Sequence, residues 1–193
     1  MPPGNGTMRT ERDEIMKVTV FGGSQPKPGD SAYAQALRLG RALAERGHTV
    51  MTGGYIGTME AVSRGACEAG GHVIGVTCAD IERWRSTGAN QWVKEEWKRT
   101  DLIERLRSLI QECDAALALP GGPGTLTEIS LMWNLMIVES IHRRPLILIG
   151  DGWQSVFDQV FSRLAQYSPE TQQTLLRFVP DIETAVQMLE NPA

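Results

Sequence analysis

The sequence predicts an α/β fold, in which a single-domain, doubly wound (Rossmann-like) parallel sheet carries helices on both faces. Short apolar runs alternate with segments of helical periodicity, an order typical of parallel strands joined by crossover helices. The 193 residues, 41% of them hydrophobic, suffice for one full core but rarely for two. Three expected strand ends carry paired glycines, and such sheets bind ligands at the carboxyl ends of their strands. We expect residues 15–193 to form this domain and the polar residues 1–14 to be a disordered leader.

In the first half of the chain, three β-rich runs alternate with two helical stripes. The first run is Met16–Phe21, and Gly22-Gly23-Ser24 ends it. Apolar residues then recur at helical spacing from Tyr33 to Ala44, and this stripe stops at Gly47, a residue typical of helix ends. The same order then repeats, with glycines again ending the helix. The expected elements are strands at 16–21, 48–52 and 72–77, and helices at 33–44 and 58–69.

The second half begins with residues 78–100, which lack clean periodicity and hold three tryptophans and many charges. We expect a long loop or a short helical lid there. Beyond it the alternation resumes, with a buried-looking run at Ala115–Leu119 followed by a glycine-rich turn. The expected elements are helices at 101–112, from the turn to about 141, and near 153–167 and 182–189, with strands at 115–119 and 145–149.

The glycine-rich turn, Pro120–Glu128, reads Pro-Gly-Gly-Pro-Gly-Thr-Leu-Thr-Glu and leads from an expected strand into an expected helix. Its glycines allow the backbone to approach a ligand closely, and the unpaired N–H groups that open a helix favour a phosphate. Thr125 is expected as the N-cap or as a hydroxyl that contacts the phosphate. Glu128 is expected in the first turn of the helix, from which its carboxylate can act on the anchored ligand. The glycines of this predicted phosphate cradle are Gly121, Gly122 and Gly124.

The same turn has a purely structural alternative. It would then be a tight α/β connection, with Glu128 complementing the helix dipole. A Walker A loop is excluded because no Gly-Lys-Ser/Thr follows, and the Gly-x-Gly-x-x-Gly dinucleotide pattern is also missing.

Two other expected strand ends, at Gly22-Gly23-Ser24 and Gly53-Gly54, would lie at the same edge as the cradle. Three such loops suggest a nucleotide-sized ligand across this edge. Ser24 either donates to a phosphate or ribose or makes an ordinary turn. Glu60, after the second loop, either contacts a base or ribose or only complements a helix dipole.

Two arginines, Arg105 and Arg107, precede the cradle on an expected helix. A guanidinium that faces Glu128 would match a phosphate, or the charge developing on a ribose, better than a lysine would. The alternative for either arginine is a solvated helix face.

Composition excludes several classes of protein. A formal net charge of −4 without a long basic run argues against a general nucleic-acid binder. No apolar stretch approaches the roughly 20 residues of a transmembrane helix. The three cysteines, Cys67, Cys78 and Cys113, are widely spaced and lack nearby histidine pairs, so we expect reduced thiols in a cytoplasmic protein and no zinc site.

The chain resembles the "lonely guy" (LOG) family of cytokinin-activating proteins. Their motif Pro-Gly-Gly-x-Gly-Thr-x-x-Glu is matched at every fixed position by Pro120–Glu128, and Arg105 stands at the family's offset of fifteen residues before the proline. Their first loop, Phe-x-Gly-Ser, is similar to Phe21–Ser24, and their Gly-Gly-x-x-Gly-x-Met loop is similar to Gly53–Met59. The resemblance extends over residues 17 to about 149.

The resemblance implies a phosphoribohydrolase that cleaves the N-glycosidic bond of an AMP-like 5′-monophosphate to free base and ribose 5-phosphate. Glu128 and Arg105 would be catalytic, and no metal or redox cofactor would be needed. The family has been catalogued, misleadingly, as possible lysine decarboxylases, but no lysine here sits in a convincing Schiff-base context. The residues implied in binding phosphate or nucleotide are Gly121, Gly122, Gly124, Thr125, Ser24, Gly22, Gly54, Gly57 and Met59.

The helix after the cradle is a candidate homodimer interface by the same resemblance. Its apolar stripe is either core or subunit contact, and a neighbouring subunit could complete the nucleotide pocket. The stripe consists of Met132, Trp133, Leu135 and Met136.

The chain departs from many family members at two positions. Leu106 stands where they have a lysine, and Thr127 where they have a second glutamate. Residues 78–100, where base selectivity is expected, also differ. A second hypothesis is therefore a non-catalytic carrier of a nucleotide or of molybdenum cofactor, as in the wider superfamily.

Overall fold

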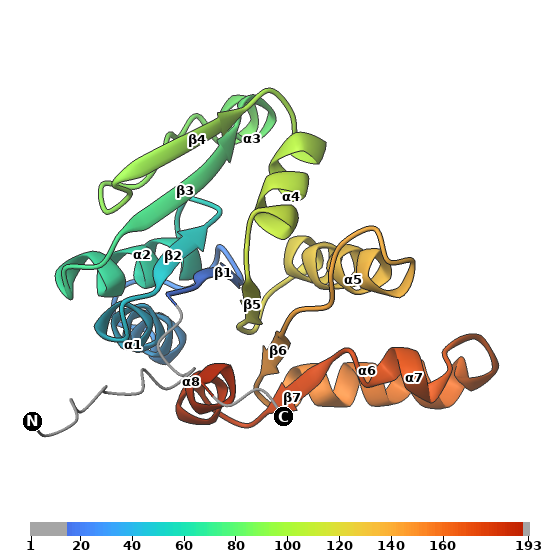
Figure 1. Cartoon of the computed structure of the whole chain (residues 1–193). Coiled ribbons are helices and arrows are strands. Elements are labelled where there is room, and N and C mark those ends of the chain that lie inside the picture. Colours follow the sequence, from blue (N-terminus) through green and yellow to red (C-terminus); the bar gives the residue numbers. More distant parts are fainter. Residues whose placement is uncertain (1–14, 191–193) are drawn as a thin grey trace, which may run out of the picture.

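A computed structural model describes residues 15–190 and contains one all-parallel sheet of seven strands. The strand order is β4-β3-β2-β1-β5-β6-β7, so the order along the sheet reverses between β1 and β5 (Figure 1). The strands are β1 (Lys17–Phe21), β2 (Thr49–Thr52), β3 (Val73–Cys78), β4 (Glu95–Arg99), β5 (Ala115–Ala118), β6 (Leu146–Ile149) and β7 (Arg177–Val179). The expected leader, residues 1–14, lies outside the described residues, as do residues 191–193.

Helices cover both faces of this sheet, which confirms the predicted doubly wound fold. Helices α1, α2 and α8 pack over one core cluster, and α4, α5 and α6 over the other. The helices are α1 (Ser31–Glu45), α2 (Thr58–Glu68), α3 (Ala79–Arg85), α4 (Leu102–Gln111), α5 (Pro123–Ile137), α6 (Asp151–Arg163), α7 (Glu170–Gln173) and α8 (Ile182–Glu190), with a short 3₁₀ turn at Ala165–Tyr167.

Alternate residues of the central strands serve the two faces. Val20 pairs in register with Leu117 and both lie in the α1/α2 cluster, whereas Ala116 and Ala118 belong to the α5 side. These strands are buried on both faces, as expected for a parallel sheet. The sheet therefore fixes β1 and β5 side by side with their carboxyl ends at one edge.

Helices α1 and α2 approach each other closely through two glycines. A Cβ on Gly40 would lie 2.0 Å from the carbonyl oxygen of Val62, and one on Gly65 would lie 1.9 Å from that of Leu37. No L side chain fits at either position without moving a backbone. The two helices can therefore pack this closely only because Gly40 and Gly65 carry no side chains.

Several predicted boundaries were wrong. Residues 78–100 contain the short helix α3 that was one of the two alternatives, but also the edge strand β4, and β7 was not predicted at all. The helix after the cradle ends at Ile137 rather than near residue 141, because Glu139 adopts a left-handed conformation with φ +56°. Helix α6 begins two residues early and ends at Arg163.

Within residues 15–190, no helix has the length and apolarity needed to cross a membrane.

Candidate active site

Three glycine loops meet where the strand order reverses. The N–H of Gly23, after β1, donates to the carbonyl of Pro120, after β5, at 3.2 Å. Gly57, in the loop after β2, has φ +75°, and a Cβ there would lie 2.6 Å from Ser24 Cα. The N–H of Thr58, which begins α2, donates to the Gly23 carbonyl at 2.9 Å. The loops that the sequence placed at one edge are therefore in contact.

The predicted phosphate cradle has an open outer face. Gly122 is the N-cap of α5 and no side chain caps this helix end, so its first N–H groups point out unpaired by side chains. No heavy atom lies within 4 Å of a Cβ built on Gly122 or Gly124. An anion could approach the backbone here without meeting a side chain.

Thr125 has a different place from the one predicted as an N-cap. It is the third residue of α5, because the helix begins with Pro123, a favoured first residue, and Gly122 occupies the N-cap position. Its side chain is only 3% exposed and lies under Gly121, where a Cβ would come within 2.2 Å of the threonine Oγ1. Its hydroxyl thus supports the turn from within, and contact with a phosphate stays a prediction.

Glu128 lies in the second turn of α5, one turn deeper than predicted, and is 8% exposed. Burial raises the pKa of its carboxyl to about 7, although the charge of Arg105 acts in the opposite direction. Its Oε1 lies 3.8 Å from Arg105 Nη1, longer than a hydrogen bond. The carboxyl is therefore poised to gain or lose a proton near neutral pH.

Arg105 projects inward from α4 and is 5% exposed. Its Nε donates to the carbonyl of Val76 at 2.8 Å and its Nη2 to that of Gly53 at 3.3 Å. A Cβ on Gly53 would lie 1.9 Å from Nη2, so this glycine makes room for the guanidinium. Arg107, by contrast, is exposed on the outer face of the same helix. The structure thus places Arg105 inside the site and Arg107 outside it, a difference that the helical periodicity of the sequence did not predict.

The other residues predicted to bind nucleotide lie at this edge, but mainly in contacts between loops. Met59 Sδ is 3.9 Å from Arg105 Nη2. Gly22 packs on Thr58, where a Cβ would come within 2.4 Å of Cγ2, and the carbonyl of Gly54 accepts hydrogen bonds from Asn90. Ligand contacts for these residues stay predictions.

Three further residues beside this edge were not predicted from the sequence: Arg85 and Asn90, in the segment 79–94, and Tyr55, in the loop after β2. Arg85 Nη2 donates to Ser24 Oγ at 3.0 Å. The Tyr55 hydroxyl exchanges hydrogen bonds with the backbone of Cys78, and the Asn90 side chain donates to the carbonyl of Tyr55 at 2.9 Å. Only long-range contacts mark these residues, so no local spacing could have identified them.

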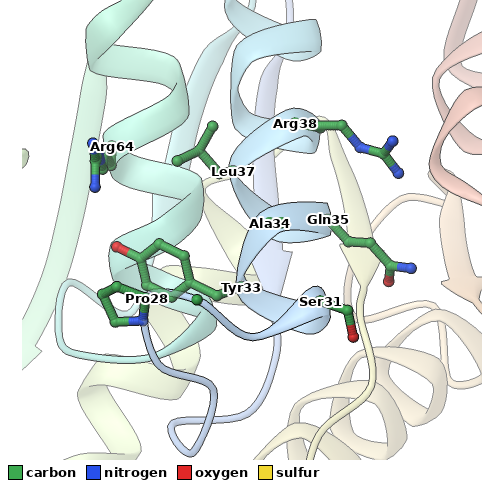
Figure 2. A pocket seen from close by; sticks show the side chains of 9 residues that line it. Pro28, Ser31, Tyr33, Ala34, Gln35, Leu37, Arg38 and Arg64 are labelled. Carbon is green, nitrogen blue, oxygen red and sulfur yellow. The ribbon is translucent and has the colours of Figure 1, made fainter.

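Glu60, for which a base or ribose contact was one alternative, accepts a hydrogen bond from the Tyr33 hydroxyl at 3.2 Å. Tyr33 lines a shallow groove of about 590 Å³ on the outer side of α1 and α2, with Pro28 and Arg64 near its ring (Figure 2). None of the residues that line this groove is a predicted site residue. The groove and the candidate site are therefore separate features.

The two positions that depart from the family pattern contribute no charged side chain to the site. Leu106 is buried in α4, and Thr127 is exposed and donates back to the Pro123 carbonyl at 2.9 Å. Two of the lysines also lie apart from it: Lys17 is at the amino end of β1, opposite to the glycine loops, and Lys98 pairs with Glu82 at 2.6 Å.

Among residues 15–190, no group of three or more His, Cys, Asp or Glu side chains could hold a metal ion. The cysteines are free thiols; Cys78 and Cys113 are buried and Cys67 is half-buried.

Comparison with known proteins identifies relatives over most of the chain. The profile of the SLOG cluster4 family matches residues 15–174. The chain is 36% identical over 141 residues to a rice protein named probable cytokinin riboside 5′-monophosphate phosphoribohydrolase LOGL5, covering 71% of this chain but only 55% of that protein. It is 32% identical over 150 residues to LOG7 of Arabidopsis thaliana, a cytokinin riboside 5′-monophosphate phosphoribohydrolase, covering 76% of this chain and 67% of the relative.

A solved structure shares the fold. The molybdenum cofactor binding protein of Rippkaea orientalis superposes with a TM-score of 0.72 over 93% of this chain and 98% of its own, at 23% identity.

Proposed function

The chain belongs to the SLOG cluster4 family and is related to the lonely guy proteins, and we propose that it is a nucleoside 5′-monophosphate phosphoribohydrolase. It would hydrolyse the N-glycosidic bond of an AMP-like nucleotide, of which AMP and a cytokinin riboside monophosphate are the candidates to test, to free base and ribose 5-phosphate. The observation that carries the proposal is the buried Glu128, with a pKa of about 7, beside Arg105 at the edge that bears the open glycine cradle.

The cradle is proposed to hold the 5′-phosphate. The open face over Gly122 and Gly124 and the uncapped start of α5 suit a dianion, because backbone N–H groups and the helix dipole both favour negative charge. Since the phosphate does not react, its binding energy can be used to orient the ribose against Glu128.

Hydrolysis breaks the bond between ribose C1′ and the base nitrogen. The bonding electron pair leaves with the base, which takes up a proton, while a water attacks C1′ and gives up a proton to become the new hydroxyl. Positive charge develops on the ribose, so the Glu128 carboxylate can stabilise it and accept the proton of the water. Arg105, anchored by two backbone carbonyls, would fix the carboxylate in place. The reaction as proposed uses neither a metal nor a redox cofactor, and no pyridoxal phosphate.

The second candidate function is a non-catalytic carrier of a nucleotide or molybdenum cofactor. The observation in its favour is that α4 and α5 bring only one carboxylate and one buried guanidinium to the site, since Leu106 and Thr127 stand where many relatives of the family carry further charges. A carrier would need the cradle but not the titrating Glu128.

Replacement of Glu128 tests the proposal against this alternative. Glu128→Gln keeps the size of the side chain but cannot accept the proton, so turnover should fall by about a hundredfold or more while nucleotide affinity is retained. Glu112→Gln, the same change at the exposed far end of α4, is the matched control and should hydrolyse at the normal rate. Equal turnover in both variants would refute the catalytic assignment.

We also propose that the protein acts as a homodimer in the cytoplasm. The stripe Met132–Met136 packs mainly into the chain's own core, which leaves the outer side of α5 for a partner, with Leu126 in its first turn 40% exposed and Val138, the residue that caps its end, 58% exposed. Three free thiols suit a reducing compartment.

A further inference from the structure

Arg85 reaches the first glycine loop from a different part of the chain. It is the last residue of α3, and its Nη2 donates to Ser24 Oγ at 3.0 Å while its guanidinium lies over the ring of Trp84, 4.6 Å from the centroid. Ser24 directly follows Gly23, whose N–H is bonded to Pro120 at the start of the cradle. The guanidinium therefore stands beside the loops that are proposed to hold the nucleotide.

The other charges around α3 are neutralised in pairs. Arg83 pairs with Asp80 on the same helix, and Lys98 pairs with Glu82 at 2.6 Å. Arg85 makes no ion pair with any of the carboxylates in residues 15–190. Its charge is thus uncompensated, and a hydroxyl is its only hydrogen-bond acceptor in the described part of the chain.

The other guanidinium of the site is not available to a phosphate. Arg105 is buried, its Nε and Nη2 donate to backbone carbonyls, and its Nη1 faces Glu128. A phosphate monoester carries about −1.5 to −2 charges at neutral pH. When Glu128 is ionised it balances Arg105, so only the backbone N–H groups of the cradle and a further cation beside it can compensate the phosphate charge.

The segment that carries Arg85 is fixed at both ends. Asp80 accepts a hydrogen bond from the N–H of Leu102 at 2.9 Å, which ties the start of α3 to α4. On the other side, the N–H of Asn90 donates to the carbonyl of Gly54 at 2.7 Å, which ties the segment to the second glycine loop. The position of Arg85 beside Ser24 therefore follows from anchored backbone on either side of it.

We propose that Arg85 binds the phosphate of the ligand, exchanging part of its contact with Ser24 for phosphate oxygens. This inference rests on the proposed function and gives the segment of residues 79–94 a part in ligand binding. A guanidinium with one N–H engaged keeps donors for a bidentate contact with a phosphate, which a lysine cannot reproduce.

Calorimetric titration with ribose 5-phosphate tests the inference without requiring turnover. Arg85→Gln should bind ribose 5-phosphate about ten- to a hundredfold more weakly than the unaltered protein, the loss expected for a charge-assisted hydrogen bond. Arg85→Lys should recover part of it. Arg83→Gln removes the same charge from the same helix, but its guanidinium is paired with Asp80, so its affinity should be unchanged.

In hydrolysis of AMP, Arg85→Gln should raise KM and change kcat less. Adenosine lacks the phosphate, so it should bind the variant and the unaltered protein with equal affinity. Equal affinity of Arg85→Gln and Arg83→Gln for ribose 5-phosphate would overturn the inference, as would failure of the unaltered protein to bind it. If binding of ribose 5-phosphate depended on Arg85 but the protein hydrolysed no nucleotide, the contact between Arg85 and phosphate would be supported and the proposed hydrolase activity would be refuted.

Discussion

At the scale of single residues, Glu128 is held between two opposing electrostatic effects. Removal from water favours the neutral acid, and the Arg105 charge favours the carboxylate. The first effect dominates because the two groups are 3.8 Å apart and make no direct hydrogen bond. The resulting pKa of about 7 suits a base that works at neutral pH.

This balance predicts the pH dependence of hydrolysis. Because the carboxylate is the active form, kcat/KM should rise with pH through a midpoint near 7 and fall about tenfold per pH unit well below it. Replacing Arg105 by Gln removes the charge that lowers this pKa, so the midpoint of any residual activity should move to higher pH. A pH–rate profile of the purified protein checks both expectations. A rate that is flat across neutrality, or that falls as pH rises, would show that Glu128 is not the base.

The sequence located this pair of residues but not its surroundings. Glu128 and Arg105 match a family motif with fixed spacing, and their side chains face each other because α4 and α5, the helices before and after β5, pack on the same face of the sheet. The depth of Glu128 depends on where α5 begins, and Pro123 starts it earlier than the threonine cap would have. Arg85 approaches Ser24 from 61 residues away, a contact that local pattern cannot reveal.

At the scale of secondary-structure elements, buried and exposed strands differed in how well they could be predicted. Strands β1, β3 and β5 are buried on both faces and consist mainly of apolar residues, so the sequence pattern predicts them. Strand β4 reads Glu-Glu-Trp-Lys-Arg and lies at the sheet edge, where backbone pairing with β3 holds it and only Trp97 packs on the core. Strand β7 has three residues, too few to show a period.

The close contact between α1 and α2 can be tested by replacing one of its glycines. Alanine favours a helix over glycine by about 1 kcal/mol, yet Gly40→Ala would put a methyl group 2.0 Å from the Val62 carbonyl oxygen. We expect the clash to dominate and the free energy of unfolding to fall by about 1–3 kcal/mol. Urea denaturation measures this directly.

Gly152→Ala is the matched control, since no heavy atom lies within 4 Å of a Cβ in this first turn of α6. It should leave stability unchanged or raise it by up to about 1 kcal/mol. If the two variants were equally stable, the close approach of α1 and α2 would not be what requires a glycine.

At the scale of the whole molecule, the candidate site is open on its outer side. The cradle from Pro120 to Gly124 is exposed, and the groove beside Tyr33 lies elsewhere. A base attached to a ribose 5-phosphate would need a further wall, which residues 79–94, through Arg85, or a second subunit could supply. The openness of the site is thus a physical reason to expect that assembly affects activity.

We predict that the protein is a dimer through the exposed face of α5. Val138→Asp places a charge at the 58% exposed residue that caps the end of α5 and should shift the mass measured by light scattering from dimer to monomer. Val156→Asp makes the same change on α6, at a 44% exposed position, and should stay dimeric. A monomeric unaltered protein, or identical masses for the two variants, would be inconsistent with this interface.

Hydrolysis of the glycosidic bond is tested by incubating the purified protein with a panel of nucleoside 5′-monophosphates, including AMP and isopentenyladenosine monophosphate, and separating the products by chromatography. We expect free base and ribose 5-phosphate in equal amounts from at least one nucleotide, and neither product from the corresponding nucleosides. Nucleotides that bind measurably but are recovered intact would contradict the proposed hydrolase and identify the protein as a carrier.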